Sequence, residues 1–258
     1  MKLYVINLDR DHERMARIGA LLQEIGAPFE RVPAVDGRTL PAPPAEAPDN
    51  AYVLSRGEIA LIRSHQNCWD LFEQSGEPYC AILEDDVHFG SDFAAFVSAP
   101  PEFPADLDLI KIEATQFKIW LNKYDSHPIT NGRKLVRLAS PHMGTAGYVL
   151  SRRGLGKVRD LTKRYQQFPI DVVVFGFPGK HLIKYQLLPS LVIQDAALKQ
   201  ANSPDYAGIT GTINRGRKPK PRGLQKVLRE IARPFRSYWP PGPLAQKWRL
   251  SYGKVEFE

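Results

Sequence analysis

The chain of 258 residues contains little cysteine and no long hydrophobic run. Its two cysteines, Cys68 and Cys80, lie in apolar segments, so we expect buried thiols rather than a disulfide framework or a cysteine metal site. No apolar run approaches the roughly 20 residues that a membrane-spanning helix needs. The first seven residues are typical of a strand and too soon polar for a signal peptide. These absences indicate a cytoplasmic protein or one bound peripherally to a membrane.

Positive charge is concentrated in the last part of the sequence. Between Arg215 and Arg249 there are 11 Lys or Arg residues and one acid, Glu230, which gives a net charge of +10. The whole chain carries +7, so the remainder carries −3 and is mildly acidic. We therefore divide the chain into a main domain, residues 1–212, and a basic C-terminal extension, residues 213–258.

Residues 223–233 of the extension predict an amphipathic helix, because Leu224, Val227, Leu228 and Ile231 recur at helical spacing among basic residues. A basic amphipathic helix followed by aromatic residues favours an anionic membrane surface, on the cytoplasmic face of the membrane. The alternative is a helix packed on the main domain with its basic face in solvent. Nucleic acid is not an expected partner, because no nucleic-acid-binding module accompanies the basic residues.

The main domain alternates predicted strands and helices. Residues 2–7 predict a strand, Asp11 caps a following helix, and residues 29–35 predict a second strand. Ser55 and Glu58 match a capping box that opens a long helix. This order predicts an α/β fold with a mainly parallel sheet flanked by helices. Further strands are predicted at 79–83, 107–113, 135–139, 145–150 and 182–188, helices at 92–97 and 151–161, and irregular chain at 117–134.

Three consecutive acids, Glu84, Asp85 and Asp86, follow the apolar strand at 79–83. Carboxylates at alternate positions of a strand end can face one site, and such hard oxygen ligands suit Mg²⁺ or Mn²⁺. Asp86, together with Glu84 or Asp85, could hold such an ion against a phosphorylated substrate. The alternative is a solvated acidic turn, which explains the motif equally well when it is taken alone.

Other polar residues fall at the carboxyl ends of neighbouring predicted strands. Asn7 ends the first strand and Asp36 ends the second, which places them beside the acidic motif at the edge where α/β sheets bind ligands. Asp36 is also explained by the Asp-Gly turn itself. Arg10 and Arg14, at the start of the first helix, could approach a phosphate or uracil.

Two titratable residues lie among apolar neighbours. His65 shares the apolar face of the long helix, where an ordinary buried histidine is the alternative to a functional one. Asp171 lies in an otherwise apolar segment, so it could be a general base or an acceptor contact, or it could cap a helix after Pro169.

Short motifs occur in a fixed order along residues 2–200. They are Ile6–Arg10, Val35–Gly37, Gly57–Ile59 followed by Ser64 and His65, Leu83–Asp86, Gly144–Tyr148, Pro169–Asp171 and Pro189–Gln194. This ordered set resembles glycosyltransferase family 25, the lipopolysaccharide and lipooligosaccharide β-galactosyltransferases, which are related to collagen galactosyltransferase domains.

The resemblance implies a GT-A fold of Rossmann type, a UDP-sugar donor, Mn²⁺ or Mg²⁺, and inverting transfer. With it, we assign Glu84 and Asp86 to the metal and Asp171 to the catalytic position near the acceptor. Gly144, Thr145 and Gln194 would belong to the acceptor site or an active-site loop. The donor-binding residues would be Asn7, Arg10, Arg14, Asp36, Gly37, Ser64, His65 and Asp85.

Residues and resemblance together predict a metal-dependent glycosyltransferase. It would move a hexose, with galactose the first choice, from UDP to a hydroxyl of a lipid-linked glycan such as the lipopolysaccharide core. A non-catalytic nucleotide-sugar-binding or membrane-adaptor protein on the same fold would instead show neither transfer nor donor hydrolysis. A metal-dependent phosphoryl hydrolase built on the acidic motif would release phosphate from simple phosphoesters.

Overall fold

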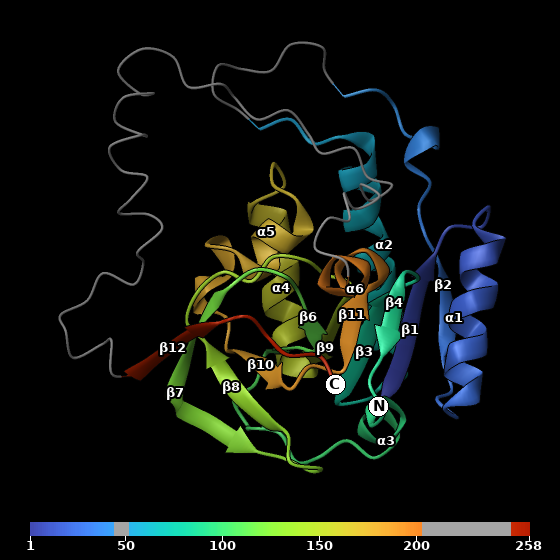
Figure 1. Cartoon of the computed structure of the whole chain (residues 1–258). Helices are drawn as coiled ribbons and strands as arrows, with labels where there is room; N and C mark the ends of the chain where they lie inside the picture. Colours follow the sequence, from blue (N-terminus) through green and yellow to red (C-terminus); the bar gives the residue numbers. More distant parts are fainter. Residues whose placement is uncertain (44–51, 203–248) are drawn as a thin grey trace, which may run out of the picture.

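A nine-stranded sheet is the centre of the computed structural model, which describes residues 1–43, 52–202 and 249–258 (Figure 1). In chain order its strands are β1 (Lys2–Asn7), β2 (Glu30–Pro33), β3 (Tyr79–Glu84), β5 (Leu109–Lys111), β7 (Ile119–Pro128), β8 (Lys134–Leu138), β9 (Gly147–Ser151), β10 (Lys184–Leu188) and β12 (Leu250–Gly253). Their order across the sheet is β12-β7-β8-β10-β5-β9-β3-β1-β2. A smaller sheet joins β4 (Val87–Phe89), β11 (Val192–Gln194) and β6 (Glu113–Ala114).

The large sheet is mixed, so the prediction of a mainly parallel sheet is wrong. The pairs β1–β2, β1–β3 and β5–β10 are parallel, and the remaining five neighbouring pairs are antiparallel. One cause is β9, which inserts antiparallel between β3 and β5. The other is the β7–β8 hairpin, which occupies most of the segment predicted to be irregular.

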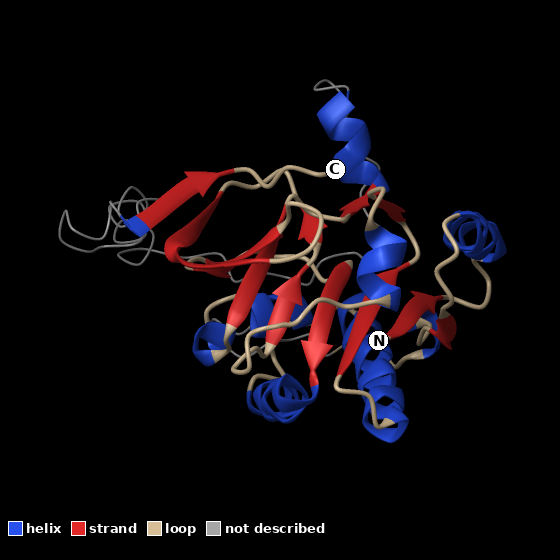
Figure 2. Cartoon of the chain, turned by 90° about the horizontal axis from the view of Figure 1, so that it is seen from below, coloured by secondary structure: helices blue, strands red, loops and turns tan. Residues whose placement is uncertain are grey.

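Helices cover both faces of the sheet (Figure 2). They are α1 (His12–Glu24), α2 (Arg56–Ser75), α3 (Phe93–Ser98), α4 (Arg152–Arg164), α5 (Ile170–Phe175) and α6 (Asp195–Asn202), with short 3₁₀ turns at Gly37–Thr39 and Pro178–His181. Alternate residues of β1 face opposite sides. Tyr4 and Ile6 pack with the core side chains of α2, α4 and α5, whereas Leu3 and Val5 pack with those of α1 and α3.

Helix α2 begins and ends where local sequence signals place it. The Ser55 side chain accepts from the Glu58 backbone, and the Glu58 carboxylate accepts from the Ser55 backbone at 2.8 Å, which confirms the capping box. Gly76, with φ of 71°, ends the helix in the left-handed conformation. The helix buries Cys68, and Cys80 is buried on β3, so both predicted buried thiols are confirmed.

Four of the last ten residues form an edge strand of the large sheet. Strand β12 pairs antiparallel with β7, and Val255, beyond it, is buried. The predicted amphipathic helix at 223–233 lies outside the described residues, as does most of the basic extension. Within the described residues, no helix combines the length and apolarity that a bilayer crossing requires.

Candidate functional site

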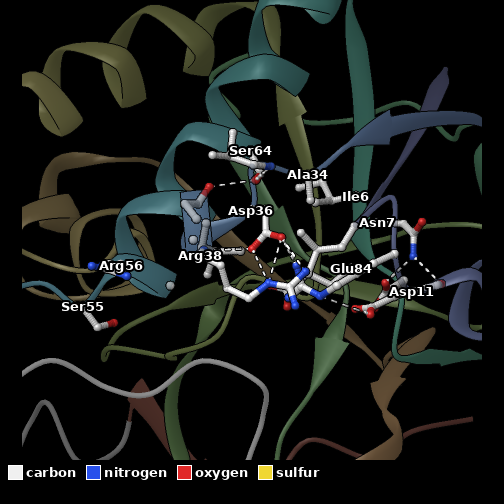
Figure 3. Close-up of a pocket in the computed structure, with 18 of the residues that line it drawn as sticks. Ile6, Asn7, Asp11, Ala34, Asp36, Arg38, Ser55, Arg56, Ser64 and Glu84 are labelled. Carbon is white, nitrogen blue, oxygen red and sulfur yellow. Dashed lines mark hydrogen bonds and ion pairs between the residues drawn. The ribbon is translucent and has the colours of Figure 1, made fainter. Parts of the chain in front are cut away.

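A cavity of about 420 Å³ opens at the carboxyl ends of β1 and β2, beside the first turn of α2 (Figure 3). Its volume falls in the range of pockets that bind small molecules. The structure brings together at its walls seven of the eight predicted donor residues, Asn7, Arg10, Arg14, Asp36, Gly37, Ser64 and Asp85, and also Glu84. The prediction that Asn7, Asp36 and the acidic motif meet at one edge is therefore confirmed, because β2, β1 and β3 are parallel there.

Asp36 is held by two arginines at the mouth of this cavity. Its carboxylate accepts from the Arg38 side chain and backbone at 2.9 Å each and forms an ion pair with Arg10. The bonds from Arg38 first, and then Arg10, hold the pKa of Asp36 well below its usual range. The residue therefore caps its turn, as the Asp-Gly alternative predicts, and also orients two guanidinium groups at the cavity.

Gly37 has a steric reason to be glycine. A Cβ atom there would lie 2.9 Å from the carbonyl oxygen of Arg56 and 3.1 Å from the backbone nitrogen of Gly57. The turn after β2 therefore touches the backbone at the start of α2, and this contact forms one wall of the cavity. Ser64 adds a second tie, because its hydroxyl accepts from the Val35 backbone at 2.9 Å.

Asp85 already has cationic and amide partners. Its carboxylate accepts from Asn7 Nδ2 at 2.7 Å and from Arg14 Nη1 at 3.0 Å, and its backbone carbonyl accepts from Arg17 at 2.9 Å. Its side chain is 10% exposed. These contacts compensate its charge, so the geometry favours Glu84 over Asp85 as the companion of Asp86 at a metal.

Glu84 and Asp86 lack such compensation. Glu84 accepts from Thr145 Oγ1 at 3.1 Å, and Asp86 accepts long bonds from Gln194 Nε2 at 3.4 and 3.5 Å. In the part of the chain that the structure describes, neither forms an ion pair with Lys or Arg. Burial raises the pKa of both carboxyls, and the charge of Asp86 raises that of Glu84 further.

A divalent cation fits this pair, because it would supply the missing positive charge to two hard oxygen ligands. Among residues 1–43, 52–202 and 249–258, no group of three or more His, Cys, Asp or Glu is placed to hold a metal. Two carboxylates could hold Mg²⁺ or Mn²⁺ only with water or substrate oxygens at the remaining coordination positions.

The predicted active-site loop joins the acidic motif to Asp171. Thr145 donates to Glu84, and the Gly144 backbone donates to Asp171 Oδ2 at 3.4 Å. Gln194, at the end of β11, reaches Asp86 from the opposite strand of the small sheet. Gly144, Thr145, Asp171 and Gln194 thus form a second group around the acidic motif, outside the walls of the cavity.

Asp171 does not cap a helix, so that alternative is wrong. Pro169 occupies the cap position of α5, and Asp171 lies in the first turn. Its Oδ1 accepts from the Val172 backbone at 2.8 Å, while Oδ2 faces the Gly144 backbone. The carboxylate is half-buried and held from two sides.

His65, the eighth predicted donor residue, is fully buried and does not line the cavity. Its Nδ1 lies 3.0 Å from the Tyr148 hydroxyl, which also accepts from Trp69 Nε1 at 3.0 Å. Its Nε2 lies 3.9 Å from Glu84 Oε1 and has no hydrogen-bond partner among the described residues. Burial lowers the pKa of His65 to about 3, so the ring that lies behind Glu84 is neutral.

The sequence analysis missed Lys111 and Glu113. Both side chains are fully buried, and they form an ion pair at 2.6 Å beneath the active-site loop. The available signal was the same as for Glu84 and Asp86: charged residues at alternate positions of an apolar strand. Arg38 and Arg56, which line the cavity, were also missed.

The sequence model of glycosyltransferase family 25, described as an LPS biosynthesis protein, matches residues 1–174. The chain belongs to glycosyltransferase family 25. Family 25 membership makes it a glycosyltransferase and favours transfer over the adaptor and hydrolase alternatives. The matched region contains the cavity, the acidic motif and Asp171, whereas Gln194 lies beyond it.

Curated relatives of this family 25 chain include bacterial and insect proteins. Lacto-N-neotetraose biosynthesis glycosyltransferase LgtB of Neisseria gonorrhoeae is 29% identical over 83% of this chain and 80% of its own length. LgtE of Neisseria meningitidis serogroup B is 28% identical over 76% of this chain and 74% of its own length. A glycosyltransferase 25 family member of Drosophila melanogaster is 27% identical over 74% of this chain, which covers 35% of the insect protein.

Proposed function

We propose that this family 25 enzyme transfers a hexose, galactose in the first instance, from a UDP-sugar to a hydroxyl of a lipid-linked glycan such as the lipopolysaccharide core. The observation that carries the proposal is the meeting of the arginine-lined cavity with the uncompensated Glu84 and Asp86 at one edge of the sheet. The parallel unit of β2, β1 and β3 supports a nucleotide-binding half of the GT-A type.

The donor would enter the cavity as a nucleoside diphosphate. Arg10 and Arg14 offer guanidinium groups to the diphosphate, and Asn7 and Asp36 offer hydrogen-bonding groups to the nucleoside. Glu84 and Asp86 would hold Mn²⁺ or Mg²⁺. When bound, such an ion offsets the charge that develops on the departing UDP.

Asp171 is the proposed general base. An inverting transfer forms a bond from the acceptor oxygen to the anomeric carbon as the bond to the UDP oxygen breaks, and the acceptor hydroxyl loses its proton. Asp171 Oδ2, held by the Gly144 backbone, would take that proton. The loop that holds Asp171 also holds Glu84 through Thr145, so base and metal ligands share one support.

Asp86→Ala tests the metal assignment. We expect turnover, followed as UDP release, to fall at least about 100-fold and UDP affinity to lose its dependence on Mn²⁺. Asp70→Asn, which breaks only a surface ion pair with Arg159, is the control and should behave like the parent. Retention of Mn²⁺-dependent binding and turnover by Asp86→Ala would reject the assignment.

Asp171→Asn tests the base. The amide keeps the size of the side chain but cannot take the proton, so we expect unchanged UDP binding and a loss of transfer of roughly 100-fold or more. Transfer near the parental rate would assign the base to another residue. A donor screen with UDP-galactose and UDP-glucose in the same UDP-release assay decides the hexose.

A membrane location belongs to the proposal through the basic segment 215–249. Since Leu250–Gly253 form a strand of the large sheet and Phe257 forms a bridge to Ser190, the test should leave residues 249–258 in place. We expect Lys226→Glu, Arg229→Glu and Arg233→Glu in one variant to reduce sedimentation with vesicles of anionic lipid. Equal sedimentation of variant and parent would reject the membrane surface.

A further inference from the structure

A buried ion pair lies beneath the active-site loop and takes no part in the contacts assigned so far. Lys111 and Glu113 end β5 and begin β6, and both side chains are fully buried. Burying two charges is costly unless their remaining hydrogen-bonding groups are satisfied. The hydrogen bonds that the Lys111 ammonium group donates therefore show which part of the site the ion pair holds in place.

The ammonium group of Lys111 holds the loop by its backbone. Its Nζ donates to the carbonyl of Met143 at 3.3 Å and to the carbonyl of Gly144. It also lies 4.7 Å from the centre of the Phe175 ring. Phe175 ends α5, the helix whose first turn carries Asp171. One buried cation thus contacts both the loop and the helix of the proposed base.

The loop fits closely over the ion pair. Gly144 has φ of 101°, and a Cβ atom there would lie 3.1 Å from Glu113 Oε1 and 3.2 Å from Lys111 Nζ. No side chain separates the loop backbone from the pair. A small movement of Lys111 would therefore move Gly144 and its bond to Asp171.

The loop contacts both the proposed base and the acidic motif. From the residues fixed by Lys111, the Gly144 backbone donates to Asp171, and the next residue, Thr145, donates to Glu84. The carbonyl of Ala146 then accepts from the Glu84 backbone at 3.0 Å. We propose that Lys111 is a positioning residue that sets Asp171 and the metal ligand Glu84 relative to each other, through residues 143–146. This inference rests on the proposed function.

The double variant Lys111→Met with Glu113→Gln tests this role, because it removes both buried charges and the bonds to the loop carbonyls. We expect kcat to fall roughly 10- to 100-fold, as for other groups that orient metal ligands. The dissociation constant for UDP measured without a divalent metal should stay within about threefold, since the cavity walls include neither residue. Glu113→Gln alone is the matched control: Lys111 keeps both carbonyl bonds, so kcat should stay within about threefold.

A kcat within about threefold of the parent in the double variant would overturn the proposal, as would an equal loss of kcat in Glu113→Gln. If the double variant does not fold, Gly144→Ala displaces the same loop from above and should show the same loss of kcat with metal-free UDP binding retained. Unchanged kcat in Gly144→Ala would then overturn the proposal. Absence of transfer by the parent enzyme overturns the proposed function and this inference together.

Discussion

His142 gives the stability of this protein a defined dependence on pH. The ring is buried between Thr115 Oγ1 and Gln186 Oε1, each at 2.8 Å, directly before the active-site loop. Burial lowers its pKa to about 3, whereas an unfolded histidine titrates near pH 6.5. Between pH 6.5 and about 3 the unfolded chain binds a proton that the native state does not, so stability falls as pH falls through this window.

The size of the effect follows from the difference between pH 5 and the pKa of histidine in the unfolded chain. At about 1.4 kcal/mol per unit, His142 lowers the free energy of unfolding by about 2 kcal/mol between pH 7 and pH 5. Urea denaturation of the parent and of His142→Asn at both pH values measures it. We expect the variant to be less stable at pH 7 but to lose about 2 kcal/mol less on acidification.

His12→Gln, at an exposed position of α1, is the control and should keep the parental difference between the two pH values. An equal loss in the parent and in His142→Asn would refute the reasoning, because it would mean that the ring charges in the native state as easily as in the unfolded chain.

Three further substitutions test local structure. Gly156→Ala, in the exposed interior of α4 with no atom within 4 Å of the new Cβ, should stabilise the protein by about 1 kcal/mol in thermal unfolding. Gly37→Ala should weaken UDP binding, measured by calorimetry, because the methyl group pushes the cavity wall away from Arg56; unchanged affinity would mean that the wall yields freely. Ser55→Ala should cost about 1 kcal/mol in urea denaturation through loss of the capping box, and a neutral result would show that water replaces the cap.

Local signals in the sequence predicted the parts of the fold that depend on neighbouring residues. The first strand, α1, β2 and the capping box of α2 follow from short-range spacing, and the structure confirms them. Strand β7 was missed because only its first three residues alternate in burial, while most of the rest is exposed. The position of β9 between β3 and β5 depends on contacts far apart in sequence, which no local pattern encodes.

The candidate site could likewise be predicted only in part. Asn7, Asp36 and the acidic motif could be placed together because strand ends of a β-α-β unit meet predictably. The separate roles of the three acids in the motif could not be predicted, because they depend on the hydrogen bond that Arg14, from another element, donates to Asp85. Lys111 was overlooked because a charged residue in an apolar strand gives no sign of which backbone carbonyls it will meet.

The two margins of the large sheet bear on how the protein behaves in concentrated solution. Strand β2 at one margin and β12 at the other have four residues each. Edges this short offer few free backbone groups to a foreign strand, and Pro33 in β2 has no N–H to contribute. In residues 1–43, 52–202 and 249–258, the shortness of both edge strands therefore limits edge-to-edge aggregation at either margin.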